Sequence, residues 1–309
     1  MKKILFITLI SATLLLGQGI SVTINPVLLT NGDALYSLGK LSPDGKYALL
    51  SGKGYTKIEL LEIPTGKSKI ITENSPGSGW GMRWNRDGQR FLFKTNSNST
   101  PDRKTVSLFE YTDGKGLSQI AELDPESNNL FFYSLLGDGI STGGKNGTGQ
   151  ILRNSNRSDD LFTSINEGRL TVVDPSGKLK PGAVEQTSLK EKVLFAEWSP
   201  SGKRLAVHSA GNGIFVFDLE SGKEYNFPKC EYPSWINDDY FAYMMTEDDG
   251  YTLLNSEVMV ARFDRSESTI ITKEFMTPAL FPSASNDGTI IFTGSDHKIY
   301  VTKVEFYKN

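Results

Sequence analysis

Trp198-Ser199-Pro200-Ser201-Gly202-Lys203-Arg204-Leu205-Ala206-Val207 is the stretch of sequence that decides the fold. It joins a turn centred on Ser-Gly to a short apolar run. The glycine supplies the positive φ that a tight hairpin turn requires. An apolar run of this length is typical of a strand that is covered on both faces. The stretch therefore predicts two antiparallel strands connected by a tight turn.

The same pattern recurs along the chain, with Asp-Gly in several copies. The other copies of the turn are Ser42–Lys46, Asn85–Gln89, Asn237–Asp239 and Ser285–Gly288. A further strand follows each unit, and its six copies are Ile58–Ile63, Val106–Tyr111, Leu170–Val173, Ile214–Phe217, Val258–Phe263 and Ile299–Val304. Most copies begin about 40–50 residues apart, which is the period of propeller blades. Such a unit cannot bury both faces alone, so its neighbours must stack against it. The sequence predicts an all-β fold, a six-bladed β-propeller.

Two features break the regularity of the repeats. The third unit is longer than the others and contains a polar stretch, 143–160, which we expect to be an inserted loop. The last unit ends after its third strand, whereas the strand-like segment Val22–Leu29 precedes the first unit. We expect this N-terminal strand to pair with the last blade beside Ile299–Val304, because that closure removes an exposed sheet edge. Residues 20–309 are thus predicted to form a single domain.

The N-terminus, residues 1–19, has the pattern of a signal peptide. Met1-Lys2-Lys3 is a basic start, Ile4–Leu16 is apolar, and Gly17-Gln18-Gly19 offers small residues for cleavage near Gly19. The alternative is an uncleaved membrane anchor, but a spanning helix needs about 20 apolar residues. We expect the mature chain to be periplasmic or secreted, with no transmembrane segment.

The repeats resemble those of a known family. Ser42-Pro43-Asp44-Gly45-Lys46-Tyr47 and the stretch from Trp198 to Ala206 resemble the repeat of TolB-like, WD-like β-propellers, and Trp84–Phe91 is a looser copy. The resemblance covers most of the chain, from about Leu35 to Val304. It implies a propeller fold. For function it implies either a periplasmic interaction protein or, as in some related propellers, a lyase or lactonase.

Composition excludes several function classes. The formal net charge is −3, so no basic excess exists to neutralise a nucleic-acid backbone. A single cysteine, Cys230, cannot form an intramolecular disulfide, and two histidines with no ligand spacing do not indicate a metal site. No nucleophile motif of a serine hydrolase is present. We therefore expect no cofactor and no metal, and a monomer whose partner is a protein or peptide of the cell envelope.

Candidate binding residues come from loops that equivalent blades must present on one rim. The predicted loops between second and third strands are Gly52–Thr56, Asn96–Thr105, Ala210–Gly213, Thr246–Thr252 and Gly294–Lys298. Trp80 is added because it follows a Gly/Ser-rich loop. The partner-binding candidates are Tyr55, Trp80, Arg103, His208, Tyr251 and His297. Aromatic residues and Arg are enriched at interfaces.

Two functions remain open. The first is a non-enzymatic propeller that binds a protein, peptide or envelope component through one face. The second is a propeller enzyme, of lyase or lactonase type, that acts on a small carbohydrate or lactone in the central funnel. The enzyme would need several converging catalytic groups. The predicted inner strands carry mainly aromatic and small residues, with Arg83 and Glu197 as isolated charges, so the sequence favours binding.

Overall fold

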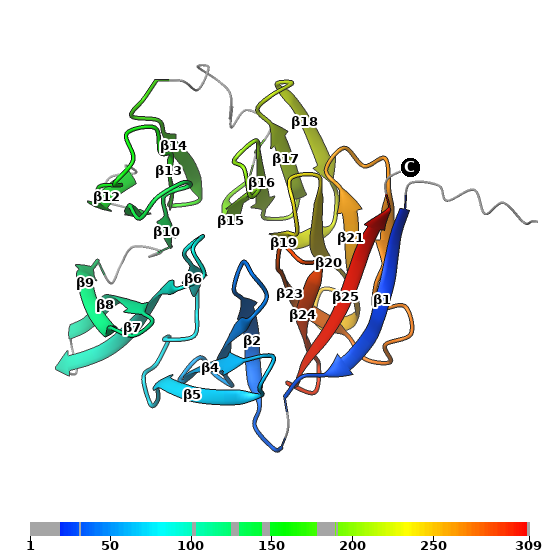
Figure 1. Ribbon diagram of the computed structural model, residues 1–309, viewed down its shortest axis with the longest axis horizontal. Helices are drawn as coiled ribbons and strands as arrows, with labels where there is room; N and C mark the ends of the chain where they lie inside the picture. Colours follow the sequence, from blue (N-terminus) through cyan, green and yellow to red (C-terminus); the bar gives the residue numbers. More distant parts are fainter. Residues whose placement is uncertain are drawn as a thin grey trace, which may run out of the picture.

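The computed structural model describes residues 19–30, 32–100, 103–124, 130–143, 149–177, 189 and 191–307. The described residues form a ring of β-sheets around a central axis, with no helix (Figure 1). Consequently none of them belongs to a helix that could cross a membrane. The fold is a six-bladed β-propeller, as the repeats predict. The expected signal peptide falls on residues 1–19, of which 1–18 lie outside the described residues.

Five blades are four-stranded antiparallel sheets. The first is β2 (Tyr36–Leu41), β3 (Tyr47–Gly52), β4 (Ile58–Glu62) and β5 (Lys67–Thr72), and the second is β6 (Arg83–Trp84), β7 (Arg90–Thr100), β8 (Arg103–Thr112) and β9 (Gly116–Leu123). The fourth is β15 (Val193–Trp198), β16 (Arg204–Ser209), β17 (Gly213–Asp218) and β18 (Lys223–Phe227). The fifth is β19 (Cys230–Trp235), β20 (Tyr240–Asp248), β21 (Leu253–Arg262) and β22 (Ser268–Ile270). The sixth combines β23 (Ala279–Ala284), β24 (Thr289–Gly294) and β25 (Ile299–Tyr307) with β1 (Gly19–Leu28).

The N-terminal strand closes the ring. β1 pairs antiparallel with β25, with Val22 opposite Val304 and Leu28 opposite Tyr300. Ile20 and Val22 also pack against the core shared by the fifth and sixth blades. The predicted pairing of Val22–Leu29 with Ile299–Val304 is therefore confirmed.

The third blade is divided. β10 (Phe131–Tyr133), β11 (Ile140–Gly143) and β12 (Gly149–Arg153) form one sheet, and β13 (Phe162–Asn166) and β14 (Arg169–Val173) form a separate two-stranded sheet. β13 contacts all three strands of the first sheet and also β15 of the fourth blade. The small sheet thus fills the space between the third and fourth blades.

The polar stretch 143–160 contains a strand where the sequence predicts only a loop. β12 occupies Gly149–Arg153, and the guanidinium of Arg153 binds both carboxylate oxygens of Glu110 in β8 at 2.8 Å. β12 is an outer strand made largely of polar residues, and Arg153 joins it to the neighbouring blade. Because the strand lacks an alternation of apolar residues, its sequence does not identify it as a strand.

The repeat turn is held by its own side chains. In the first blade, Ser42 Oγ donates to Asp44 Oδ1 at 2.7 Å, and the N–H of Gly45 donates to the Ser42 carbonyl at 2.9 Å. The φ of Gly45 is 73°, a left-handed conformation that a side chain disfavours. Ser285 and Asp287 repeat the side-chain bond at 2.6 Å. The aspartate fixes the turn and the glycine permits it, which accounts for the recurrence of Asp-Gly.

Tryptophans at the ends of first strands connect adjacent blades. The indole N–H of Trp84 in β6 donates to the carbonyl of Lys40 in β2 at 3.0 Å, and that of Trp235 in β19 donates to the carbonyl of Glu197 in β15 at 2.9 Å. The sequence predicts a packing role for these periodic indoles, and the hydrogen bonds show that they also fix the spacing of the inner strands.

We predict that a truncation beginning at Ala34 destabilises the protein. It removes β1, and with it the pairing to β25 and the burial of Ile20 and Val22. The expected loss is about 3 kcal/mol in the free energy of unfolding, measured by urea denaturation. Val27→Ala is the matched control, because this side chain of the same strand is 50% exposed, and its effect should stay within about 0.5 kcal/mol. Equal stability of truncated and intact chains would contradict ring closure by β1.

Candidate functional site

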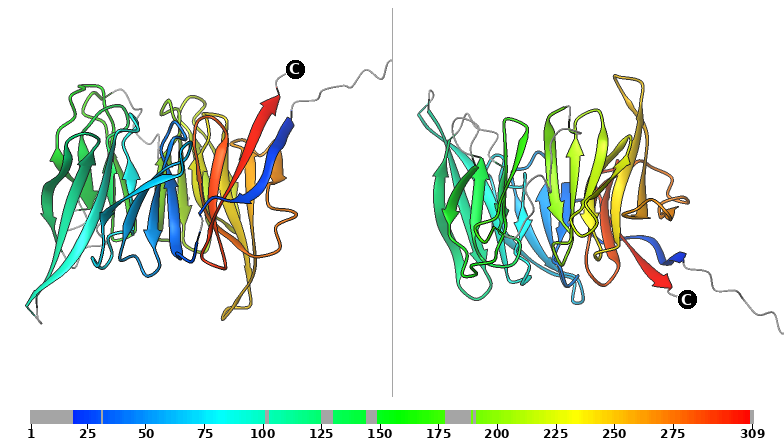
Figure 2. Two further views of the ribbon diagram at one scale, coloured as in Figure 1. Left: turned by 60° about the horizontal axis from the view of Figure 1, so that its bottom comes forward. Right: turned by 90° about the horizontal axis from the view of Figure 1, so that it is seen from above.

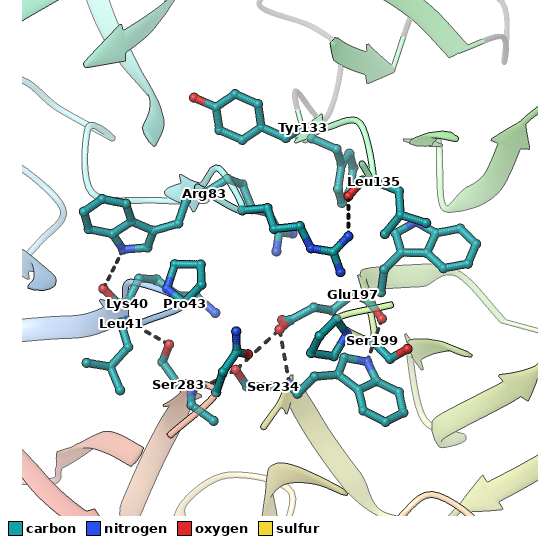
Figure 3. A pocket seen from close by; sticks show the side chains of 18 of the residues that line it. Lys40, Leu41, Pro43, Arg83, Tyr133, Leu135, Glu197, Ser199, Ser234 and Ser283 are labelled. Carbon is teal, nitrogen blue, oxygen red and sulfur yellow. Dashed lines mark hydrogen bonds between the residues drawn. The ribbon is translucent and has the colours of Figure 1, made fainter. Parts of the chain in front are cut away.

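A pocket lies on the axis of the ring, at the face formed by the turns between first and second strands (Figure 3). Its volume is about 210 Å³. The first strands of all six blades contribute to its wall, and the turn residues Pro43, Leu135 and Pro200 line its mouth. The loops between second and third strands lie at the opposite ends of the second strands. The pocket therefore opens on the face opposite to the predicted rim.

The first strands present two layers of side chains to the axis. In four blades, residues two positions apart on one strand supply one member to each layer. In β2 and β15 this follows because alternate strand residues share a face, whereas in β19 and β23 a bulge lies between the two residues. The layer nearer the pocket mouth contains Lys40, Glu197, Ser234 and Ser283, and the deeper layer contains Leu38, Phe195, Tyr232 and Phe281. The upper layer is polar and belongs to the pocket, whereas the deeper layer is apolar.

Two partly buried cations line the pocket, Lys40 of the upper layer and Arg83 of β6. The Arg83 guanidinium lies 4.1 Å from the ring centroid of Phe195 and 4.9 Å from that of Phe132. Its Nε and Nη2 atoms are buried and have no hydrogen-bond partner. Lys40 Nζ lies 5.2 Å from the Phe195 centroid. Burial lowers the pKa of Lys40 to about 8 and the pKa of Arg83 to about 10.

One anion faces these cations. Oε1 of Glu197 accepts hydrogen bonds from the N–H of Trp235 at 3.3 Å and from Ser234 Oγ at 3.5 Å. The Glu197 charge opposes the burial effect and raises the pKa of both Lys40 and Arg83. Two partly buried cations against one carboxylate leave the base of the pocket positively charged at neutral pH.

β-Bulges bring the deeper aromatic side chains together. The pairing of β19 with β20 shifts between Glu231 and Ser234, and that of β23 with β24 shifts between Leu280 and Ser283. Inside these bulges, Tyr232 has a φ of 52° and Phe281 a φ of 53°. Their ring centroids are 4.9 Å apart. Non-glycine residues with positive φ are strained, and such strain concentrates at functional sites.

Three of the predicted binding residues gather behind the aromatic layer. Tyr55 and Trp80 pack edge-to-face at 5.4 Å, and His208 lies 5.8 Å from the Tyr232 ring. Burial raises the pKa of Tyr232 to about 12, and the nearby Tyr55 adds to this shift. His208 is buried, and burial lowers its pKa to about 4. It is a neutral core histidine at physiological pH.

The other three predicted residues lie apart. Tyr251 is 99% exposed in the β20–β21 turn, and His297 lies in the β24–β25 loop, where its carbonyl accepts the N–H of Tyr36 at 2.8 Å. Arg103 is the first residue of β8, so the predicted loop Asn96–Thr105 is wrong. β7 and β8 form a long hairpin that extends beyond the ring on the same side as the β20–β21 hairpin (Figure 2). The segment Asn96–Thr100 is polar and resembles a loop in sequence, although it pairs with β8.

No metal-binding cluster is found among the described residues. Within them, no three His, Cys, Asp or Glu side chains form a group that could hold a metal ion. Cys230 is buried, and burial raises its pKa to about 11, so its thiol is not activated. The groups that converge at the axis are cationic and aromatic.

Comparisons with known proteins establish the fold. No family model and no curated protein matches the chain. Among solved structures, an oligogalacturonate lyase from Vibrio parahaemolyticus matches with a TM-score of 0.55 and 14% identity, over 93% of this chain and 96% of that one. A protein assigned as TolB from Agrobacterium tumefaciens matches with a TM-score of 0.51 and 13% identity, over 95% and 100%. The resemblance to TolB-like propellers is confirmed for the fold.

We predict that Glu197→Gln and Arg83→Met shift the pKa of Lys40 in opposite directions. Loss of the Glu197 charge should lower this pKa below about 8, whereas loss of the Arg83 charge should raise it. The measurement is an NMR titration of the lysine Cε signal in protein with labelled lysine. Glu305→Gln, an exposed substitution outside the pocket, should leave the signal unchanged. Shifts in the same direction for both pocket variants would contradict the arrangement of charges.

Proposed function

We propose that this protein is an exported binding propeller that receives a carboxylate-bearing segment of a protein or peptide in its central pocket. The observation that carries the proposal is the partly buried Arg83, whose Nε and Nη2 atoms are themselves buried and lack hydrogen-bond partners. A buried unpaired donor costs free energy, and more so when the group is charged. A ligand carboxylate removes this cost.

The chemistry of the pocket suits a carboxylate. The planar guanidinium of Arg83 can donate two parallel hydrogen bonds to one carboxylate. Phe195 and Phe132 hold that guanidinium by stacking against it, so little side-chain entropy remains to be lost on binding. Lys40 adds a second positive charge in a region of low dielectric, where a charge pair is stronger than in water.

A second candidate function rests on Lys40. An amine with a pKa of about 8 can act as a general base near neutral pH. Beside Arg83 it could take the proton α to a carboxylate, whose developing charge Arg83 would stabilise, while a β-linked oxygen leaves with the electron pair. This is the chemistry of a lyase that acts on an acidic sugar, and the similar structure from Vibrio parahaemolyticus is described as an oligogalacturonate lyase.

The predicted rim on the opposite face is a separate surface. Tyr55 and Trp80 pack together on this side and Tyr251 is exposed on its hairpin, whereas His208 is buried against Tyr232. Its role in partner binding stays a prediction. Because rim and pocket occupy different faces, substitutions at the rim serve as controls for the pocket.

We predict that Arg83→Met and Lys40→Met each weaken binding of a short acidic peptide at least tenfold, because each removes a cation from the pocket. Calorimetry measures the affinity. Lys53→Met, at an exposed lysine of the β3–β4 loop, and the double substitution Tyr55→Ala with Tyr251→Ala should bind like the wild type. Equal affinity of the pocket variants would overturn the proposal. Cleavage of oligogalacturonate to an unsaturated product, lost in Lys40→Met, would establish the lyase instead.

We also predict a pH dependence with a defined sign. A carboxylate is ionised above about pH 5, so only the pocket titrates in the alkaline range. Affinity should be constant up to about pH 7 and fall as the pH rises through the Lys40 pKa, about 8. Lys40→Met should bind weakly with a flat profile over this range. Affinity that rises with pH in the wild type would contradict a role for the Lys40 ammonium.

A further inference from the structure

We propose that the pocket recognises the end of a chain: the free C-terminal carboxylate of an extended peptide, which enters end first. This inference rests on the proposed function and specifies its ligand. It follows from three properties of the pocket, namely its floor, its volume and its single acidic side chain.

The charged layer of the pocket rests on aromatic side chains that are not part of the pocket lining, and we call these side chains the floor. Phe195 lies directly behind both cations, 4.1 Å from Arg83 and 5.2 Å from Lys40. Its ring centroid is 6.3 Å from that of Tyr232, which in turn is 4.9 Å from that of Phe281. Three blades thus place rings across the axis, beneath the charged layer. A chain that enters from the turn face meets this apolar floor where it reaches the cations, so the ligand ends there.

The volume of the pocket admits one residue. It measures about 210 Å³, below the range of about 300–1,000 Å³ that is typical of pockets for whole small ligands. The carboxylate of an internal Asp or Glu stands on a short stem, so its approach to the floor would bring two chain segments into the mouth. A C-terminal carboxylate brings only one. The rest of the peptide would lie over the turns at Pro43, Leu135 and Pro200.

The walls of the pocket favour a terminal residue with an uncharged side chain, preceded by a peptide bond whose N–H can be bound. Trp84, Trp198 and Trp235 are among the residues that line the pocket. Their indole N–H groups already donate to the framework, to the Lys40 carbonyl, Thr163 Oγ1 and the Glu197 carbonyl respectively. Trp235 is buried in the core between two blades, whereas Trp84 and Trp198 are partly exposed and offer apolar surface to the terminal side chain. Glu197 would repel a second carboxylate and can accept the N–H of the terminal peptide bond. An oligomer of uronic acids, with a carboxylate on every unit, fits this arrangement less well.

Three matched peptides test the inference. The first is an acetylated hexapeptide of Ser, Gly and a terminal Leu, with a free α-carboxylate. The second is its C-terminal amide, and the third is the amide with an Asp at the fourth position. Intrinsic fluorescence is a suitable readout because three of the four tryptophans line the pocket. We expect the free acid to bind at least tenfold more tightly than either amide, and Arg83→Met to abolish that preference.

Each of the other outcomes overturns the inference, and together they show whether the proposed function fails with it. If the Asp-containing amide binds as tightly as the free acid, and both lose affinity in Arg83→Met, the proposed function stands and recognition of a chain end is overturned. If none of the peptides binds but oligogalacturonate does, the pocket takes an acidic sugar and the inference is wrong. If neither anion binds, the proposed function fails together with the inference. Lys53→Met should match the wild type in every arm.

Discussion

Closure of the ring is the constraint on which the rest of the structure depends. The second strand of a blade is buried on both faces, as in β16, where every residue from Arg204 to Ser209 is buried. Such a strand is stable only between two neighbouring sheets, so no blade can stand at an open end. The chain meets this requirement by pairing β1 with β25, which makes the last blade four-stranded. Closure fixes six first strands around one axis, and the functional chemistry develops there.

Crowding at the axis explains the character of the pocket. The first strands converge so closely that only a few side chains fit at each level. The strand period places polar groups at one level and aromatic groups at the next, and bulges in β19 and β23 bring Tyr232 and Phe281 into the deeper level. The aromatic level supports Arg83 by stacking and desolvates Lys40. Burial lowers the pKa of both cations because it disfavours their charged forms. A bound anion would stabilise those charged forms again.

The sequence predicted the repeating elements well because their causes are local. Asp44-Gly45 and its copies mark turns whose hydrogen bonds lie within a few residues, and Val22–Leu29 alternates like a strand that needs a partner. It does not indicate the pocket on the axis, because the causes there are not local. Arg83 and Glu197 stand out as charges on inner strands, but nothing in the sequence distinguishes Lys40 from any other lysine in a strand. Nothing in the sequence indicates that a bulge turns Tyr232 toward Phe281. The functional face was expected at the loop rim, since loops usually carry binding residues, and the orphaned donors of Arg83 lie at the opposite face.

The most direct test of the account is proton uptake on binding, measured by calorimetry in buffers of different ionisation enthalpy. A carboxylate beside Lys40 stabilises its ammonium form and raises its pKa above the value of about 8 in the free protein. Binding of a peptide acid at pH 8 should therefore take up about half a proton per site, falling to near zero at pH 6 and in Lys40→Met. Binding at pH 8 without proton uptake would show that the ligand does not contact Lys40 and would contradict the central claim.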